Sequence, residues 1–282
     1  MNDNDIIVLE KLSYYLNFNS TMINQKQMNY MLKNGLSESM AYRSLLLDYL
    51  EIDSPSLKNY FTSNLCLLDT LEYLNNPYYK NINFLNVKNN KWEFKISKYE
   101  PYELFVKDDF IFENDMVLPS LGYFNKPFYY PSVYENNRLW MSVTPNEINT
   151  MKKPIEEACG NVCTIGLGLG YYTYMVSLKE NVKSVTVVER DKEVIELFKK
   201  YILPQIEFKD KIKIIESDCF SFLDKMDTNY DYLFIDIWHD VSDGIMLYKK
   251  ILPYEKKYPN TKFRYWIYDT MKYYLWGVIY EW

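Results

Sequence analysis

The chain has 282 residues, of which 48% are hydrophobic and 18% are aromatic. This length suggests two domains, and the apolar content suffices for a sizeable core. The 32 Lys and Arg residues against 38 Asp and Glu residues give a formal net charge of −6, which offers no bulk attraction to phosphate backbones or anionic lipid. We therefore expect a small-molecule partner, and neither a nucleic-acid nor a membrane partner.

Four cysteines are present without CxxC spacing, and the chain has a single histidine. We therefore expect free thiols and no metal site. No apolar stretch approaches the roughly 20 residues of a membrane span, and the acidic residues 1–5 are unlike a secretory leader. These features predict a cytoplasmic protein.

The first quarter of the chain has apolar residues at helical spacing. Helices are predicted over residues 6–18 and 28–32 and from Ser37 onward, and Ser54-Pro55 begins another that continues through Leu71. The pattern then changes to short β-like runs. They cover residues 81–87, 91–96, 103–106, 110–112 and 138–143, with Asn89-Asn90 as a hairpin turn.

Residues 118–131 are dense in aromatic side chains, and their glycine and prolines predict a loop. These side chains would either line an acceptor pocket or pack in the core, and core packing is the favoured interpretation. The residues concerned are Tyr123, Phe124, Phe128, Tyr129, Tyr130 and the nearby Trp140.

A helix is predicted from residue 144 to residue 159, because Thr144 and Glu147 have the spacing of a capping box and Pro145 suits the first turn. Strands and helices then alternate, which predicts an α/β fold with a parallel sheet covered on both faces. The strands are expected at residues 162–165, 184–188, 211–215, 232–237 and 262–268, with helices starting near residues 170, 192, 220 and 242. We place a domain boundary between residues 1–143 and 144–282.

A glycine-rich turn, Gly166-Leu167-Gly168-Leu169-Gly170, follows the first of these strands. A dinucleotide site would have its third glycine at position 171, which is Tyr171. Glu189 ends the second strand, where a carboxylate can accept from both hydroxyls of a ribose. Asp218 follows the third strand in the same way.

The G-x-G-x-G turn, together with acids after the next two strands, resembles the S-adenosylmethionine-dependent methyltransferases over about the last 130 residues. The resemblance implies a Rossmann-like domain that binds S-adenosylmethionine. The implied contacts are Gly166, Leu167, Gly168 and Gly170 through the turn, Glu189 on the ribose, Asp218 and Cys219 on the adenine, and Asp236 and Trp238 beyond the fourth strand.

The fourth strand runs into Asp236, Trp238, His239 and Asp240. Ligands of open α/β sheets bind beyond the carboxyl ends of the strands, so this stretch is the expected reacting end. Asp236, His239 and Asp240 are the candidates for orienting an acceptor and removing its proton. In the other interpretation, His239 bonds to a backbone group and Trp238 packs beneath the cofactor.

A β-rich segment ahead of the Rossmann-like domain also resembles the spermidine synthases, which implies a site for Thr144 and Glu147 near the nucleoside and suggests a homodimer. That family typically has G-G-G-D-G and D-S-S-D-P where this chain has Gly166–Gly170 and Asp236–Asp240. The sheet also ends after its fifth strand, so the N-terminal region must supply a wall of the acceptor pocket.

These features favour an S-adenosylmethionine-dependent methyltransferase with a small-molecule acceptor. Aminopropyl transfer from decarboxylated S-adenosylmethionine and a non-catalytic cofactor-binding scaffold are the alternatives.

Overall fold

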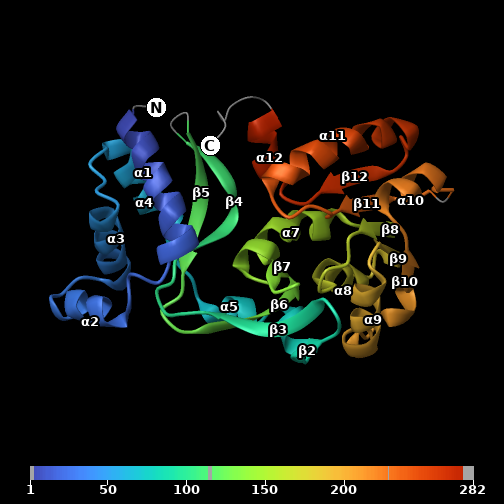
Figure 1. Cartoon of the computed structure of the whole chain (residues 1–282), viewed down its shortest axis with the longest axis horizontal. Helices are drawn as coiled ribbons and strands as arrows, with labels where there is room; N and C mark the ends of the chain where they lie inside the picture. Colours follow the sequence, from blue (N-terminus) through green and yellow to red (C-terminus); the bar gives the residue numbers. More distant parts are fainter. Residues whose placement is uncertain (1–2, 114–115, 228, 276–282) are drawn as a thin grey trace. The chain divides into compact units, whose positions relative to one another are not determined.

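A computed structural model describes residues 3–113, 116–227 and 229–275 (Figure 1). The chain forms two compact units, one from residues 1–73 and 98–129 and the other from residues 74–97 and 130–282. The second unit therefore takes in residues 74–97 and 130–143, which the sequence assigned to the N-terminal domain. In the described part of the chain, no helix combines the length and the apolar character needed to cross a membrane.

The first unit combines helices with a three-stranded sheet. Its helices are α1 (Asp3–Tyr14), η1 (Tyr15–Asn19), α2 (Gln25–Lys33), α3 (Glu38–Tyr49), α4 (Pro55–Asn64) and α5 (Thr70–Leu74). The last residue of α5, Leu74, already belongs to the second unit. The strand order is β1 (Leu65–Leu67), β5 (Met116–Tyr123) and β4 (Phe105–Glu113), with β1 parallel and β4 antiparallel to β5. The predicted continuation of α4 through Leu71 is wrong, because Leu65–Leu67 pairs with β5 instead.

The loop predicted at residues 118–131 is also wrong, since most of it belongs to β5 and β6 (Phe128–Glu135). Pro119 is tolerated in β5 because it lies opposite a register shift between Asp108 and Ile111, where the ladder needs no donor. Core packing is confirmed for three of the aromatic side chains, which are at most 1% exposed: Tyr123, Phe124 and Phe128. The Tyr123 ring stacks on Tyr42 with centroids 3.8 Å apart.

The second unit is built on a five-stranded parallel sheet in the order β10-β9-β8-β11-β12. Its strands are β8 (Gly160–Ile165), β9 (Val182–Glu189), β10 (Ile212–Glu216), β11 (Tyr232–Ile235) and β12 (Lys262–Tyr265). The strand order reverses at β8, which creates the crevice where ligands of such sheets bind. The α/β, Rossmann-like fold class is confirmed, including a sheet of five strands in the described residues.

Helices cover both faces of this sheet, because alternate strand residues point to opposite sides. One face packs on α7 (Pro145–Glu157), α8 (Tyr171–Ser177) and α9 (Lys192–Tyr201). The other packs on α10 (Cys219–Lys225), α11 (Val241–Lys257) and α12 (Tyr268–Leu275). Short 3₁₀ turns, η2 (Leu203–Gln205) and η3 (Lys209–Lys211), lead into β10.

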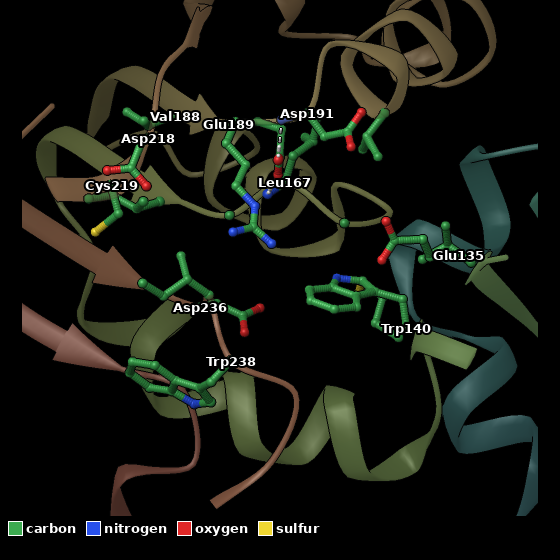
Figure 2. Close-up of a pocket in the computed structure, with 18 of the residues that line it drawn as sticks. Glu135, Trp140, Leu167, Val188, Glu189, Asp191, Asp218, Cys219, Asp236 and Trp238 are labelled. Atoms are coloured by element: carbon green, nitrogen blue, oxygen red, sulfur yellow. Dashed lines mark hydrogen bonds between the residues drawn. The ribbon is translucent and has the colours of Figure 1, made fainter. Parts of the chain in front are cut away.

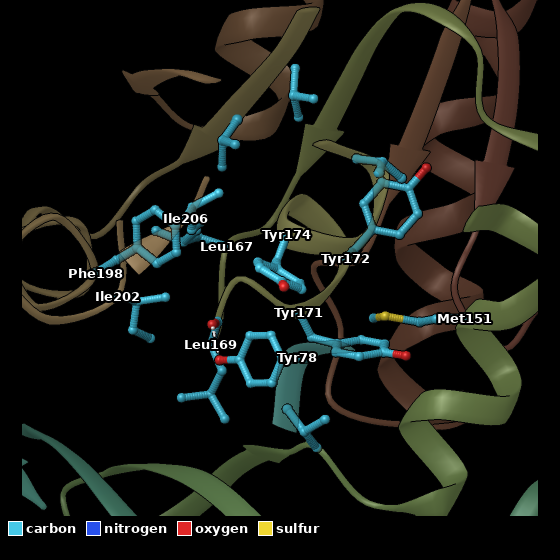
Figure 3. Packing of buried hydrophobic residues seen from close by; sticks show 14 of the residues in the cluster. Tyr78, Met151, Leu167, Leu169, Tyr171, Tyr172, Tyr174, Phe198, Ile202 and Ile206 are labelled. Carbon is cyan, nitrogen blue, oxygen red and sulfur yellow. Dashed lines mark hydrogen bonds between the residues drawn. The ribbon is translucent and has the colours of Figure 1, made fainter. Parts of the chain in front are cut away.

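Tyrosines fix the start of α8 against α6 (Pro77–Asn81), as Figure 3 shows. The Tyr78 hydroxyl donates to the carbonyl of Leu169 at 2.7 Å, and its ring meets Tyr171 and Tyr174 edge to face. The end of the glycine-rich turn is therefore fixed by contacts with buried tyrosine side chains, of which Tyr78 is only 1% exposed.

A second sheet of this unit has the order β2-β3-β6-β7, with β2 (Val87–Lys88), β3 (Trp92–Tyr99) and β7 (Arg138–Ser142). The predicted hairpin around Asn89-Asn90 is confirmed, although its first strand is short and residues 77–81 form α6. Lys91 in this turn makes ion pairs with Asp191 (2.6 Å) and Glu135 (3.1 Å). The hairpin is thereby attached to the first residue before α9, which explains why it belongs to the second unit.

Candidate active site

The carboxyl ends of four neighbouring strands open into one cavity of about 400 Å³, within the usual range of small-molecule sites. From β10 through β9 and β8 to β11, the strand ends contribute Asp218, Glu189, Gly166 and Asp236 to its wall. Figure 2 shows the three carboxylates of this set around one space, together with Trp140 and Glu135 from the four-stranded sheet β2-β3-β6-β7. The residues expected at the ends of four separate strands are thus brought together.

Gly166 allows the turn after β8 to pass close to the end of β11. Its φ is +103°, and a Cβ there would lie 1.9 Å from the carbonyl oxygen of Asp236. Leu167 and Gly168 also line the cavity, and a side chain on Gly168 would collide with Met141. Gly170 does not line the cavity: it precedes α8 and packs on the Phe198 ring.

Glu189 is held in a single orientation by backbone donors. Its Oε1 accepts from the N–H of Asp191 at 2.8 Å and its Oε2 from the N–H of Leu167 at 3.1 Å. Burial raises the pKa of Glu189, against the lowering effect of these hydrogen bonds. Each oxygen still has a lone pair for a further donor, so the carboxylate can accept two adjacent hydroxyls.

Asp218 caps α10 and faces the cavity at the same time. Its Oδ1 accepts from the N–H groups of Phe220 (3.0 Å) and Ser221 (3.1 Å). In the described residues, Oδ2 has no hydrogen-bond partner and can accept from a ligand amine. Cys219 lines the cavity beside it, and burial raises the pKa of its thiol to about 12, so it contributes a neutral, apolar surface.

Asp236 shares the cavity wall with Glu147. The sequence placed Glu147 in a capping box and, through the resemblance to the spermidine synthases, near the nucleoside. Thr144 makes no side-chain capping bond and Glu147 is only 5% exposed, so the predicted capping box is wrong. Burial and the charge of Asp236 raise the pKa of Glu147 well above its usual range. Burial, followed by the charge of Glu189, raises the pKa of Asp236 to about 7.

The other two predicted catalytic residues, His239 and Asp240, lie outside the cavity lining. His239 Nε2 lies 3.1 Å from the carbonyl oxygen of Leu139, which can only accept, so Nε2 carries a hydrogen. Asp240 caps α11 through Ser242, within a reciprocal capping box with Asp243. Burial works to raise the pKa of Asp240, but its hydrogen bonds hold it below the usual value.

Trp238 is 3% exposed, lines the cavity and stacks on Tyr265 at 6.2 Å. Its indole Nε1 has no hydrogen-bond partner among the described residues. It therefore both packs in the core and leaves a buried donor for a ligand.

The four-stranded sheet β2-β3-β6-β7 supplies another wall of the cavity, made of Trp92, Val133, Glu135, Trp140 and Met141. Of these, only Trp140 was identified from the sequence as a pocket candidate. Among the described residues, no group of three or more metal-binding side chains comes together. The site therefore consists of a Rossmann-like strand edge closed by a β-sheet wall.

Part of the chain matches a known protein family. Residues 148–257 match the spermine/spermidine synthase domain. The predicted resemblance to the spermidine synthases is confirmed over this stretch, which is less than half of the chain. No curated protein sequence matches the chain significantly.

Three solved structures illustrate the similarity. The chain is 16% identical to a putative O-methyltransferase from Klebsiella pneumoniae, with a TM-score of 0.30, covering 39% of this chain and 47% of that one. It is 21% identical to a precorrin 8w decarboxylase from Methanobacterium thermoautotrophicum (TM-score 0.31; 39% and 56% covered). It is 19% identical to the spermidine synthase from Thermotoga maritima (TM-score 0.32; 42% and 44% covered). The chain thus spans about half the length of the structures it matches.

Proposed function

We propose that the protein is a transferase that binds S-adenosylmethionine and moves its methyl group to the nitrogen of a small amine. The observation that carries the proposal is the row of strand-end carboxylates in one cavity, with Glu189 held by backbone donors at one end and Asp236 at the other. The residues present fit this nucleoside: Asp218 suits an exocyclic amine, Cys219 an aromatic ring and Glu189 a ribose diol.

When bound, S-adenosylmethionine supplies an electrophilic methyl group: the acceptor nitrogen bonds to the methyl carbon, the carbon–sulfur bond breaks and sulfur keeps the electron pair. The chain aligns the two reactants, which is the main requirement of such a displacement. Asp236 takes the proton that the nitrogen loses. Its pKa of about 7 suits that role near neutral pH.

The charge of the cavity favours an amine. Six carboxylates line it: Glu135, Glu147, Glu189, Asp191, Asp218 and Asp236. The lining includes two cations, Lys91 and Arg190, and Lys91 is already paired with Glu135 and Asp191. Such a wall attracts a positively charged acceptor and repels an anionic one.

Aminopropyl transfer is the second candidate, favoured by the family match over residues 148–257. Arg190 favours methyl transfer over aminopropyl transfer, because a guanidinium in the cavity can bind the carboxylate of S-adenosylmethionine. The decarboxylated form lacks that group. We expect the Rossmann-like unit to prefer the cofactor that retains it.

Calorimetric titration of the purified chain with S-adenosylmethionine, its decarboxylated form, S-adenosylhomocysteine and NAD tests the proposal. We expect tight binding of the first and third and weak binding of the other two. Labelled-methyl incorporation into a panel of amines and into cell extract then tests turnover. Preference for the decarboxylated cofactor would favour aminopropyl transfer, and binding without any incorporation would favour a scaffold.

A further inference from the structure

Glu147 is a buried carboxylate in the cavity wall. It lies in the first turn of α7, its side chain is 5% exposed, and its Oε1 has no hydrogen-bond partner among the described residues. Removing a carboxylate from water without a partner is unfavourable. Because Glu147 also lines the cavity, the group that would satisfy this oxygen is a donor on a ligand.

Asp236 is the neighbour that decides the chemistry of Glu147. The charge of Asp236 disfavours ionisation of Glu147, and Glu189 at the end of β9, on the other side of β8, acts on Asp236 in the same direction. From α8, Tyr171 is a further titratable group that interacts electrostatically with Glu147. Among the described residues, neither Lys91 nor Arg190, the cations of the cavity wall, forms an ion pair with Glu147 or Asp236.

The order of the strands locates this pair relative to a bound nucleoside. Asp218 follows β10 and Glu189 ends β9, whereas Asp236 follows β11 on the far side of the β8 turn. A nucleoside with its base at Asp218 and its ribose at Glu189 therefore extends its sulfur end toward Asp236. Glu147 and Asp236 then face the reacting centre.

We infer that Glu147 and Asp236 form one carboxylate pair that holds the positively charged groups at the reacting centre and receives the proton of the acceptor. The inference rests on the proposed function and extends it, because Glu147 becomes a second catalytic residue. Two neighbouring carboxylates without a cation keep one proton between them. A cationic group at the pair displaces that proton, and the pair takes one back when the acceptor nitrogen is alkylated.

The test needs no knowledge of the acceptor. Sinefungin is an S-adenosylmethionine analogue that carries a C–NH3⁺ group where the cofactor has S⁺–CH3. S-adenosylhomocysteine has a neutral thioether sulfur at the same position. The ratio of their dissociation constants therefore reports the negative charge at the reacting centre. We would measure it by calorimetry on the full chain near pH 7, in two buffers of different ionisation enthalpy, so that released protons are counted.

Wild-type protein is expected to bind sinefungin roughly tenfold or more tighter than S-adenosylhomocysteine, with net proton release. Glu147→Gln should abolish most of that preference and lower the proton release, while its affinity for S-adenosylhomocysteine stays within about twofold. Glu156→Gln is the matched control, since it removes an exposed carboxylate from the same helix, α7, outside the cavity lining. Its ratio should equal that of the wild type.

An unchanged ratio in Glu147→Gln, with S-adenosylhomocysteine binding intact, overturns the role of Glu147 and leaves the proposed function standing. Failure of wild-type protein to bind either nucleoside overturns both.

Discussion

The Glu189 carboxylate accepts a hydrogen bond from the backbone N–H of Leu167 at 3.1 Å, which ties the end of β9 to the glycine-rich turn after β8. One side chain therefore shapes the turn and also presents its remaining lone pairs to the cavity. Because Asp191 donates to the other oxygen, the carboxylate is oriented before any ligand arrives. Such preorganisation reduces the entropy lost on binding.

Glu189→Gln should weaken the binding of S-adenosylhomocysteine by about 10- to 100-fold, the effect of losing charge-assisted hydrogen bonds of roughly 1.5–3 kcal/mol. Calorimetric titration measures this directly. Glu196→Gln is the control, because Glu196 is an exposed residue of α9 that pairs only loosely with Lys192, at 3.9 Å. Equal affinities of Glu189→Gln and wild type would remove Glu189 from the nucleoside site.

Asp236 should make the folded state less stable as the pH rises. Its folded pKa, about 7, lies above the ordinary value of 3.8, so the folded state holds a proton that the unfolded chain has lost. The contribution of Asp236 to the free energy of unfolding is therefore greatest below about pH 4. It falls as the pH rises toward 7 and stays low above pH 7.

Asp236→Asn removes this dependence and should raise the free energy of unfolding at pH 8 by on the order of 1–3 kcal/mol, with a smaller gain at pH 5. Urea denaturation at the two pH values measures the difference. A substitution that stabilised the protein equally at both, or destabilised it at pH 8, would contradict the raised pKa. A gain in stability combined with lost turnover is the usual trade-off at a catalytic site.

Asp240→Ala separates a capping role from a catalytic one. Asp240 accepts from the backbone N–H of Ser242 at 2.8 Å at the start of α11, and the loss of such a cap costs about 1 kcal/mol. We expect a lower denaturation midpoint at pH 7 and an affinity for S-adenosylhomocysteine within about twofold of the wild type. Asp240→Asn, which can still cap the helix, should restore most of the stability. A large loss of turnover in Asp240→Asn without a loss of stability would instead support a catalytic Asp240.

Local signals in the sequence were sufficient for the Rossmann-like region. Buried parallel strands are continuous apolar runs, and the glycine spacing after β8 depends on contacts within one turn. The strands expected at residues 162–165 and 184–188 therefore match β8 and β9 closely. Glu189 and Asp218 could be placed because Glu189 is the last residue of β9 and Asp218 lies two residues beyond β10.

The capping role predicted for Glu147 is wrong, because an acid three residues after a potential cap has the same spacing whether it caps the helix or faces a ligand. Only the resemblance to the spermidine synthases implied a place near the nucleoside. The observations that distinguish the two are the burial of Glu147 in the cavity wall and its electrostatic interaction with Asp236, 89 positions later, which no local pattern contains. The segment at residues 118–131 failed for a similar reason. Pro119 and Gly122 read as loop residues, yet a bulge in β4 accommodates the proline and the missing side chain of Gly122 admits Leu68.

Gly166 should be far more sensitive to substitution than another glycine of positive φ. In Gly166→Ala the new Cβ would meet the carbonyl oxygen of Asp236 at 1.9 Å, so the backbone of β11 or of the turn must move. Gly35 has a φ of +86° and nothing within 4 Å of an added Cβ, so Gly35→Ala carries only the conformational cost, about 1–2 kcal/mol. We expect Gly166→Ala to cost more than about 3 kcal/mol and to abolish nucleoside binding, since it displaces Asp236 and Leu167 together. Denaturation midpoints and S-adenosylhomocysteine titrations of both variants test this. Similar costs for the two would mean that the turn after β8 is not held against β11, and that the cavity does not depend on their close approach.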